Sequence, residues 1–132
     1  MLYTMRKATL LISILAFGAF GMLADDLSDY QAMMKAAAGA NGAANGAVAG
    51  GDVAAVAAKA KDAAAAFDQM TAFWKAKGKD DAVKFSMSAS EALKAAASAT
   101  SIDDQKAALA KVRPTCGGCH MVYRDGSKFK GM

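Results

Sequence analysis

The residues best suited to chemistry in this chain occupy five consecutive positions near its C-terminal end. Cys116, Cys119 and His120 lie in the sequence Cys-Gly-Gly-Cys-His, and they are the only two cysteines and the only histidine of the 132 residues. This spacing is that of covalent c-type haem attachment, in which two thiols add across the haem vinyl groups and the imidazole takes an axial position on iron. On a helix the three residues fall at i, i+3 and i+4, so both sulfurs and the ring share one face.

Other chemistries use the same residue types. A dithiol redox site places Cys-x-x-Cys at a strand-to-helix turn, and no strand-like alternation flanks Cys116. A structural zinc site normally has four protein ligands, whereas this motif supplies three. A disulfide between Cys116 and Cys119 fits the spacing but leaves His120 without a role. We therefore predict one covalent haem c per chain with its iron bound by His120, and we keep a thiol oxidoreductase as the enzyme-class alternative.

The absence of a second histidine bears on catalysis. With His120 as an iron ligand, the sequence offers no other imidazole to act as general acid or base. Peroxidase-type catalysis therefore lacks its usual groups, and we expect a protein that is not an enzyme.

Residues 1–24 have the layout of a secretory signal peptide. Arg6 and Lys7 precede an apolar run at 8–20, and no acidic residue occurs before the end of the segment. The run is shorter than the about 20 apolar residues of a membrane span. We expect cleavage after residue 24, with cleavage after Gly21 or an uncleaved membrane anchor as alternatives. Covalent haem attachment takes place outside the bacterial cytoplasmic membrane, so the segment and the motif agree on a periplasmic location.

Residues 25–132 are enough for one domain. They carry fourteen basic and twelve acidic residues, which alternate in groups such as Lys61-Asp62 and 79–81. Interspersed charges of this kind are typical of solvated helix faces rather than of a nucleic-acid surface. We expect no nucleic-acid partner.

Composition predicts helices throughout this domain. Alanine dominates, Pro114 is the only proline, and β-branched residues are sparse. The domain is divided by breaks at Gly50-Gly51, Gly78 and Thr100-Ser101, and each break is followed by a helix start signal. We predict that Pro114 kinks or restarts the last helix. The four predicted helical segments are about 26–49, 52–77, 79–99 and 101–124.

Apolar residues recur in these segments at steps of three and four, which places them on one face of each helix. Such seams pack helices at small crossing angles, and short connections make neighbours antiparallel. The sequence therefore predicts an all-α fold, an antiparallel up-down-up-down four-helix bundle. Because alanine seams bury little area, we expect the haem to supply much of the core. The seam residues are Leu27, Tyr30, Met34, Ala37, Asn41, Ala44 and Val48; Val53, Val56, Ala60, Ala63, Phe67, Met70 and Trp74; Ala82, Val83, Phe85, Ala89, Ala92, Leu93 and Ala96; and Ile102, Gln105, Leu109, Val112, Cys116, Cys119 and Tyr123.

The stretch Asn41–Gly46 is unfavourable for a helix. Its two glycines together cost about 2 kcal/mol relative to alanine. A close approach by a neighbouring helix, by the haem or by a second copy of the chain would give them a purpose, so a homodimer stands beside the monomer as an expectation. The plain alternative is that the helix frays or bends there.

The segment Cys116–Arg124, near the C-terminal end of an exported all-helical chain, resembles the closing motif of the class II cytochromes c. This group comprises cytochrome c prime and its low-spin c-556 branch, whereas class I members carry the motif near the N-terminus. The resemblance covers essentially all of 25–132, with a weaker match at Tyr30–Lys35. It implies an electron carrier with redox partner proteins, in which Tyr123 and Arg124 contribute to cofactor binding.

The resemblance also bears on the second iron ligand. Family members with a methionine at the position of Met34 are six-coordinate electron carriers, which implies Met34 as a ligand here, with Met33 as the second choice. Members with an apolar residue there leave the site open, so the alternative function is a five-coordinate protein that binds nitric oxide or carbon monoxide. Methionine also fills gaps in cores, which is the structural alternative for Met34.

This chain departs from the family pattern at several positions. Tyr30 replaces an arginine that meets a haem propionate, which leaves Arg124, Arg113 or Lys35 as substitutes. The resemblance implies a place at the haem edge for Trp74, and a large core anchor is its alternative role. Within the motif, Gly117 and Gly118 weaken the helix and would allow a close approach to the porphyrin.

Overall fold

The computed structural model describes residues 26–126 and 128–129, and the predicted signal peptide at 1–24 lies outside them. The described chain is helical apart from one two-stranded ladder, so the all-α class is confirmed. None of its helices combines the length and apolar character needed to cross a membrane. The elements are α1 (Asp26–Val48), α2 (Val53–Ala76), α3 (Asp80–Ser98), α4 (Ile102–Ala110), α5 (Val112–Tyr123), β1 (Arg124–Asp125) and β2 (Lys128–Phe129).

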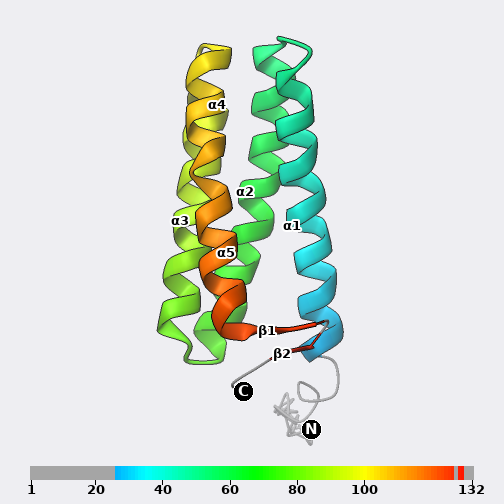
Figure 1. Cartoon of the computed structure of the whole chain (residues 1–132), viewed down its shortest axis with the longest axis vertical. Helices are drawn as coiled ribbons and strands as arrows, with labels where there is room; N and C mark the ends of the chain where they lie inside the picture. The colour runs from blue at the N-terminus through cyan, green and yellow to red at the C-terminus, as the bar shows by residue number, and fades with distance from the viewer. Residues whose placement is uncertain (1–25, 127, 130–132) are drawn as a thin grey trace, which may run out of the picture.

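The helices lie side by side along the long axis of the molecule (Figure 1). α1 packs along α2, α2 packs along α3, and α3 packs against both α4 and α5. α1 also touches α4, but it makes little direct contact with α5. The space between α1 and α5 is therefore where the helices are least closely joined.

Local signals in the sequence account for the short connections. The Asp52 side chain accepts a hydrogen bond from the backbone N–H of Ala55 at 3.2 Å and caps α2. The Ser101 hydroxyl caps α4 in the same way through Asp104, also at 3.2 Å. Gly51 and Gly78 have φ angles of +69° and +68°, a conformation that glycine adopts without a Cβ clash.

The last predicted segment is interrupted once and ends at a turn. It divides at Lys111 into α4 and α5, with Pro114 in the first turn of α5, where a missing N–H is tolerated. The predicted restart at proline is thus confirmed. The helix then ends at Tyr123, because Arg124 and Asp125 pair with β2 across a turn at Gly126, whose φ is +59°.

The predicted seams are confirmed. Every seam residue is buried or half-buried, and the largest fully buried side chains include Trp74 and Leu93. Gln105, also on a seam, is 0% exposed and donates from Nε2 to the carbonyl of Val53 at 2.9 Å. Seam periodicity therefore located the core correctly in all four predicted segments.

The stretch Asn41–Gly46 stays helical within α1, so the structure does not show the fraying that stood as one alternative there. The Asn45 side-chain amide donates to the carbonyl of Asn41 at 2.9 Å. A Cβ added at Gly42 or Gly46 would meet nothing within 4 Å, so no close approach among the described residues requires these glycines.

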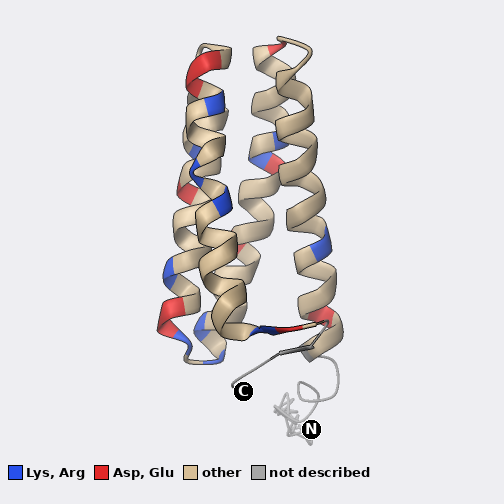
Figure 2. Cartoon of the chain, viewed as in Figure 1, with Lys and Arg blue, Asp and Glu red and all other residues tan. Residues whose placement is uncertain are grey.

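The two ends of the helices carry buried side chains of different size. The end near the α1–α2 and α3–α4 connections, which we call the alanine end, contains Ala44, Val56, Ala60, Ala92, Leu93, Ala96, Gln105, Ala108 and Leu109. The opposite end, which we call the aromatic end, contains Tyr30, Phe67, Met70, Phe73, Trp74, Phe85 and Tyr123. Figure 2 shows basic and acidic residues interspersed along both ends on the face in view.

Candidate haem site

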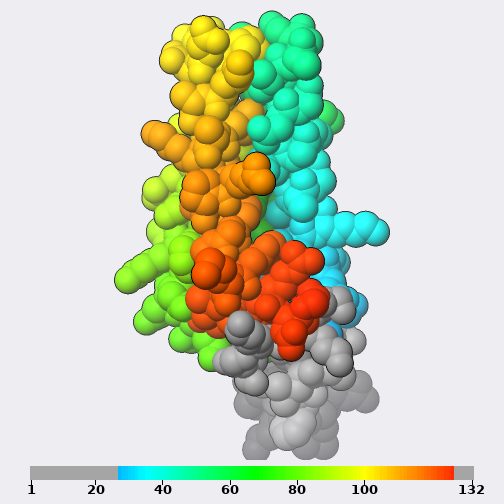
Figure 3. All heavy atoms as spheres, viewed as in Figure 1, coloured from blue at the N-terminus to red at the C-terminus, as the bar shows by residue number. Residues whose placement is uncertain are grey.

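α5 places the three motif residues on one face, as predicted. Cys116, Cys119 and His120 are all half-buried, and both cysteines are free thiols packed against the core. Figure 3 shows the orange and red surface of α5 and β1 beside the cyan surface of α1. The motif therefore faces the space where α1 and α5 are not closely packed.

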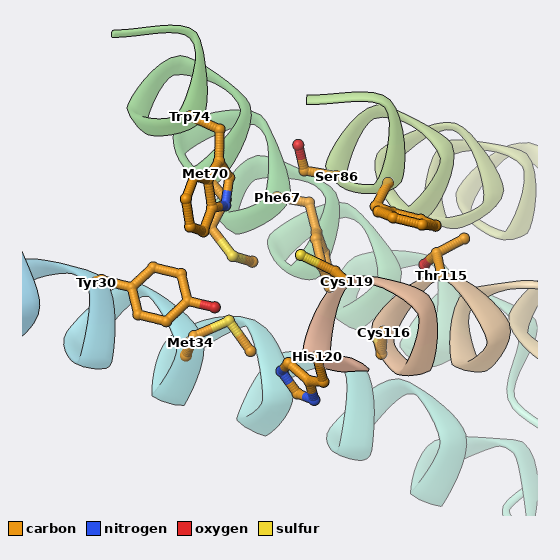
Figure 4. Close-up of a pocket in the computed structure, with 11 residues that line it drawn as sticks. Tyr30, Met34, Phe67, Met70, Trp74, Ser86, Thr115, Cys116, Cys119 and His120 are labelled. Carbon is orange, nitrogen blue, oxygen red and sulfur yellow. The ribbon is translucent and has the colours of Figure 1, made fainter. Parts of the chain in front are cut away.

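An apolar cleft lies at this position, at the aromatic end, and its space of about 20 Å³ would hold about one water molecule. Figure 4 shows its lining side chains pointing inward from α1, α2, α3 and α5. The lining residues are Tyr30, Met34, Phe67, Met70, Trp74, Phe85, Ser86, Thr115, Cys116, Cys119 and His120.

Met34 and His120 come from different helices and line the same cleft. In Figure 4 the Met34 thioether and the His120 ring lie on the α1 and α5 sides of one space. Met33 is half-buried and packs against the core, and it is not among the described residues that line the cleft. Of the two predicted methionines, Met34 is therefore the one brought into the same cavity as the histidine.

Two grooves continue from the cleft. The outer groove, of about 430 Å³, runs toward the β1–β2 turn and shares Tyr30, Met34 and His120 with the cleft. Lys35 and Arg124 also line it. The opposite groove, of about 540 Å³, begins at Cys116 and runs toward the alanine end; its lining residues are Asn41, Asn45, Leu109, Ala110, Arg113 and Cys116.

An aromatic cluster backs the cleft. Trp74 is 1% exposed and lies 5.5 Å from Tyr30 and 4.8 Å from Tyr123, measured between ring centroids. The Tyr123 hydroxyl donates to the carboxylate of Asp81. Trp74 lines the cleft, whereas Tyr123 contacts Trp74 and is not among the described lining residues. The role of Tyr123 in cofactor binding therefore stays a prediction.

The two motif glycines have different surroundings. A Cβ on Gly118 would lie 2.5 Å from Cε1 of Phe85, a distance that real Cβ contacts do not reach. A Cβ on Gly117 would meet nothing within 4 Å. Gly118 therefore makes room for a ring of α3 that lines the cleft, which is a role that the sequence alone did not indicate.

Burial sets the protonation of the motif. It raises the pKa of Cys119 to about 11, with the nearby Asp81 carboxylate adding to the effect, and it also raises the pKa of Cys116. Burial and the Arg124 charge lower the pKa of His120. The imidazole is thus neutral at neutral pH, the form that binds metals. Dithiol oxidoreductases use the opposite shift, a lowered thiol pKa.

Sequence reasoning missed part of the lining. Phe67, Met70 and Phe85 were identified as core seam residues, yet they border the cleft. Ser86 and Thr115 were not identified at all, because a hydroxyl near the core carries no periodic signal. The Ser86 oxygen lies 2.9 Å from the Thr71 hydroxyl, and Thr115 donates to the Val112 carbonyl at 2.7 Å. These polar groups are therefore partnered within the protein.

The residues that line the cleft have the donor types that a covalent haem uses. No group of three or more His, Cys, Asp or Glu side chains in the described ranges is placed to hold a metal ion. The apolar cleft is lined by two thiols and an imidazole from α5 and by the Met34 thioether from α1. These groups match the chemistry of a covalent haem whose iron takes two protein ligands. The cleft itself is small, and the outer groove that continues from it, of about 430 Å³, falls in the range of small-molecule sites.

Comparison of the chain with protein-family models, with curated proteins and with solved structures finds no match.

Proposed function

We propose that this protein is a monohaem c-type cytochrome that carries single electrons. The observation that carries the proposal is the shared cleft, which Met34 of α1 and His120 of α5 line together with both thiols. In this proposal Cys116 and Cys119 would hold the haem through thioether links, and His120 and Met34 would bind its iron. When bound, the haem iron supplies a one-electron couple.

The protein residues hold and insulate the cofactor. Phe67, Met70 and Trp74 are each at most 6% exposed and form an apolar wall, which excludes water from one side of the cleft. A thioether ligand and a dry pocket both favour the reduced state of haem iron and so raise its potential. Nothing in this arrangement requires a substrate to be transformed, so we propose a carrier rather than an enzyme.

The finer architecture belongs to the same proposal. α1, α2 and α3 pack in sequence order through short connections, and α4 with α5 follows against α3. This arrangement supports an up-down-up-down four-helix bundle in which α4 and α5 form one interrupted helix. We further propose export to the periplasm after removal of 1–24, with redox proteins as partners.

The raised thiol pKa values argue against the thiol oxidoreductase alternative. A reactive dithiol needs a thiolate near neutral pH. Burial raises the pKa of Cys119 to about 11, so its thiol stays protonated. Addition to the haem vinyl groups is a covalent step made once during maturation and does not depend on such reactivity in the folded protein.

The test is an absorption spectrum of protein matured with haem, oxidised and reduced, alongside Met34→Ala and its neighbour Met33→Ala. We expect sharp low-spin bands and a far-red sulfur-to-iron band that Met34→Ala abolishes and Met33→Ala retains. A broad high-spin spectrum that shifts on adding carbon monoxide would instead identify the five-coordinate gas binder. Protein that acquires no covalent haem would refute both.

A further inference from the structure

We propose that Lys35 and Arg124 bind the two haem carboxylates in the outer groove, and that the β1–β2 turn exists to position Arg124. This inference rests on the proposed function and adds to it the orientation of the cofactor in its site. It chooses among the three basic residues that sequence analysis left as substitutes for the missing arginine at position 30.

The first step is the position of the thiols. Haem carries its vinyl groups on one edge and its two propionates on the opposite edge, so the thioether links fix where the carboxylates go. Cys116 lines the cleft and the groove toward the alanine end, and Cys119 lines the cleft. Neither thiol is among the described residues that line the outer groove. The carboxylate edge therefore lies on the side of the outer groove.

The second step is charge. Lys35 of α1 and Arg124 of β1 both line the outer groove, and none of its described lining residues is acidic. Two positive charges thus border a groove without a carboxylate to balance them. Two propionates have the matching charge, and an arginine or lysine on a carboxylate forms a charge-assisted hydrogen bond. The groove toward the alanine end offers Arg113 as its single charged side chain among the described lining residues.

The third step is the geometry of the turn. Arg124 leaves the helix and pairs with Phe129 across β1 and β2, which carries its backbone out of α5. Its Nε donates to the carbonyl of Gly126 at 2.9 Å, which leaves the two terminal nitrogens of the guanidinium for other acceptors. Gly126 holds a φ of +59°, where a side chain would be strained. The hydrogen bond to Gly126 therefore holds the Nε edge of the guanidinium, and in this proposal the terminal nitrogens would meet the haem carboxylates.

The direct test is nuclear magnetic resonance of the haem-loaded full chain in its diamagnetic reduced form, as the carbon monoxide adduct if the iron proves five-coordinate. We expect through-space contacts from the propionate methylene protons to the Arg124 and Lys35 side chains. Contacts to Arg113 and Asn41 instead would overturn the proposal. Chain without covalent haem gives no such signals, and that outcome refutes the proposed function rather than this inference.

Charge variants supply a second readout. Equilibrium with a redox dye, at fixed pH and low salt, measures how readily the proposed haem is reduced in each variant. Arg124→Gln and Lys35→Gln each remove a positive charge beside the carboxylates, so reduction becomes less favourable by up to about fivefold, the size of an exposed ion pair. The matched control Arg113→Gln should change the equilibrium by less than about twofold. Gly126→Ala should reproduce part of the Arg124→Gln effect. An Arg113→Gln effect larger than that of Arg124→Gln would contradict the assignment.

Discussion

The alanine end and the aromatic end are built from the same helices, yet they pack in different ways. At the alanine end, residues such as Ala60 and Ala96 are fully buried, so the helices close directly on one another. At the aromatic end, Phe67 and Trp74 are also buried from solvent but border the apolar cleft. Alanine and aliphatic side chains fill most of the first end, whereas aromatic side chains border a cleft at the second.

Under the proposed function, this difference would confine the dependence on haem to one end of the fold. Interiors of proteins are packed to the density of organic crystals, and a void deprives its lining of contacts. The aromatic end thus lacks contacts that a bound group would supply. At the alanine end the described helices pack through Ala60, Leu93 and Ala96, which do not line the cleft, so we expect that packing to be ordered with or without the proposed haem.

The largest expected effect comes from removing the cofactor. In Cys116→Ser/Cys119→Ser protein, amide hydrogen exchange should quicken by more than about tenfold, or 1.4 kcal/mol, at the aromatic end of α2, α3 and α5. Exchange at the alanine end should change much less, because its contacts do not involve the cleft. Equal acceleration at both ends would contradict the comparison.

Core truncation should give the next largest effect. Trp74→Ala removes a side chain that is 1% exposed and contacts Tyr30 and Tyr123, so we expect a loss of about 3–5 kcal/mol in the free energy of unfolding. Val56→Ala at the alanine end should cost about 2 kcal/mol. Urea unfolding of the haem-loaded variants measures both. Equal losses would mean that side-chain size does not separate the two ends.

Glycine substitutions should act in opposite directions. Gly118→Ala places a Cβ 2.5 Å from the Phe85 ring, and displacing that ring should cost about 1–3 kcal/mol. Gly117→Ala on the same helix and Gly46→Ala in α1 meet nothing within 4 Å, so each should stabilise by about 1 kcal/mol. Thermal unfolding measures the three. A stabilising Gly118→Ala would show that Phe85 yields without cost.

The smallest expected effect is on pH dependence. The hydrogen bond from the Tyr123 hydroxyl lowers the pKa of Asp81 below its ordinary 3.8, and desolvation of the carboxyl opposes part of this shift. A carboxyl whose pKa is lower in the folded protein than in the unfolded chain adds stability. This stability is fully present above the unfolded pKa and is lost as the pH falls through the folded pKa. Tyr123→Phe should therefore flatten the decline in stability below about pH 4.

Asp68 provides the matched control for this pH effect. The Ser90 hydroxyl and then Lys94 lower its pKa, at a site away from the cleft. Ser90→Ala should flatten the same acid limb by a separate amount, additive with Tyr123→Phe. The Tyr123 phenol has the opposite pH dependence. Its hydrogen bond to Asp81 raises its pKa to about 12, so the stability that it adds is lost as the pH rises beyond about 10.

The sequence predicted the helices and their buried faces because alanine content and periodicity are local signals. It also identified Met34 as a residue of the seam that lines the cleft. It missed the β1–β2 turn, since a two-residue ladder has no periodicity and depends on the φ of Gly126. It also missed the contact of Gly118 with Phe85, which joins two helices whose spacing no local pattern encodes.

The cleft is lined from α1 and α5, the first and last helices of the described chain, as well as from α2 and α3. Closing a loop costs more entropy the longer it is, so joining α1 to α5 across the cleft is costly, whereas α5 packs against α3 through a short connection. The proposed haem would be linked to α5 and would meet Met34 of α1, so it would strengthen a pairing to which the described chain contributes few direct contacts.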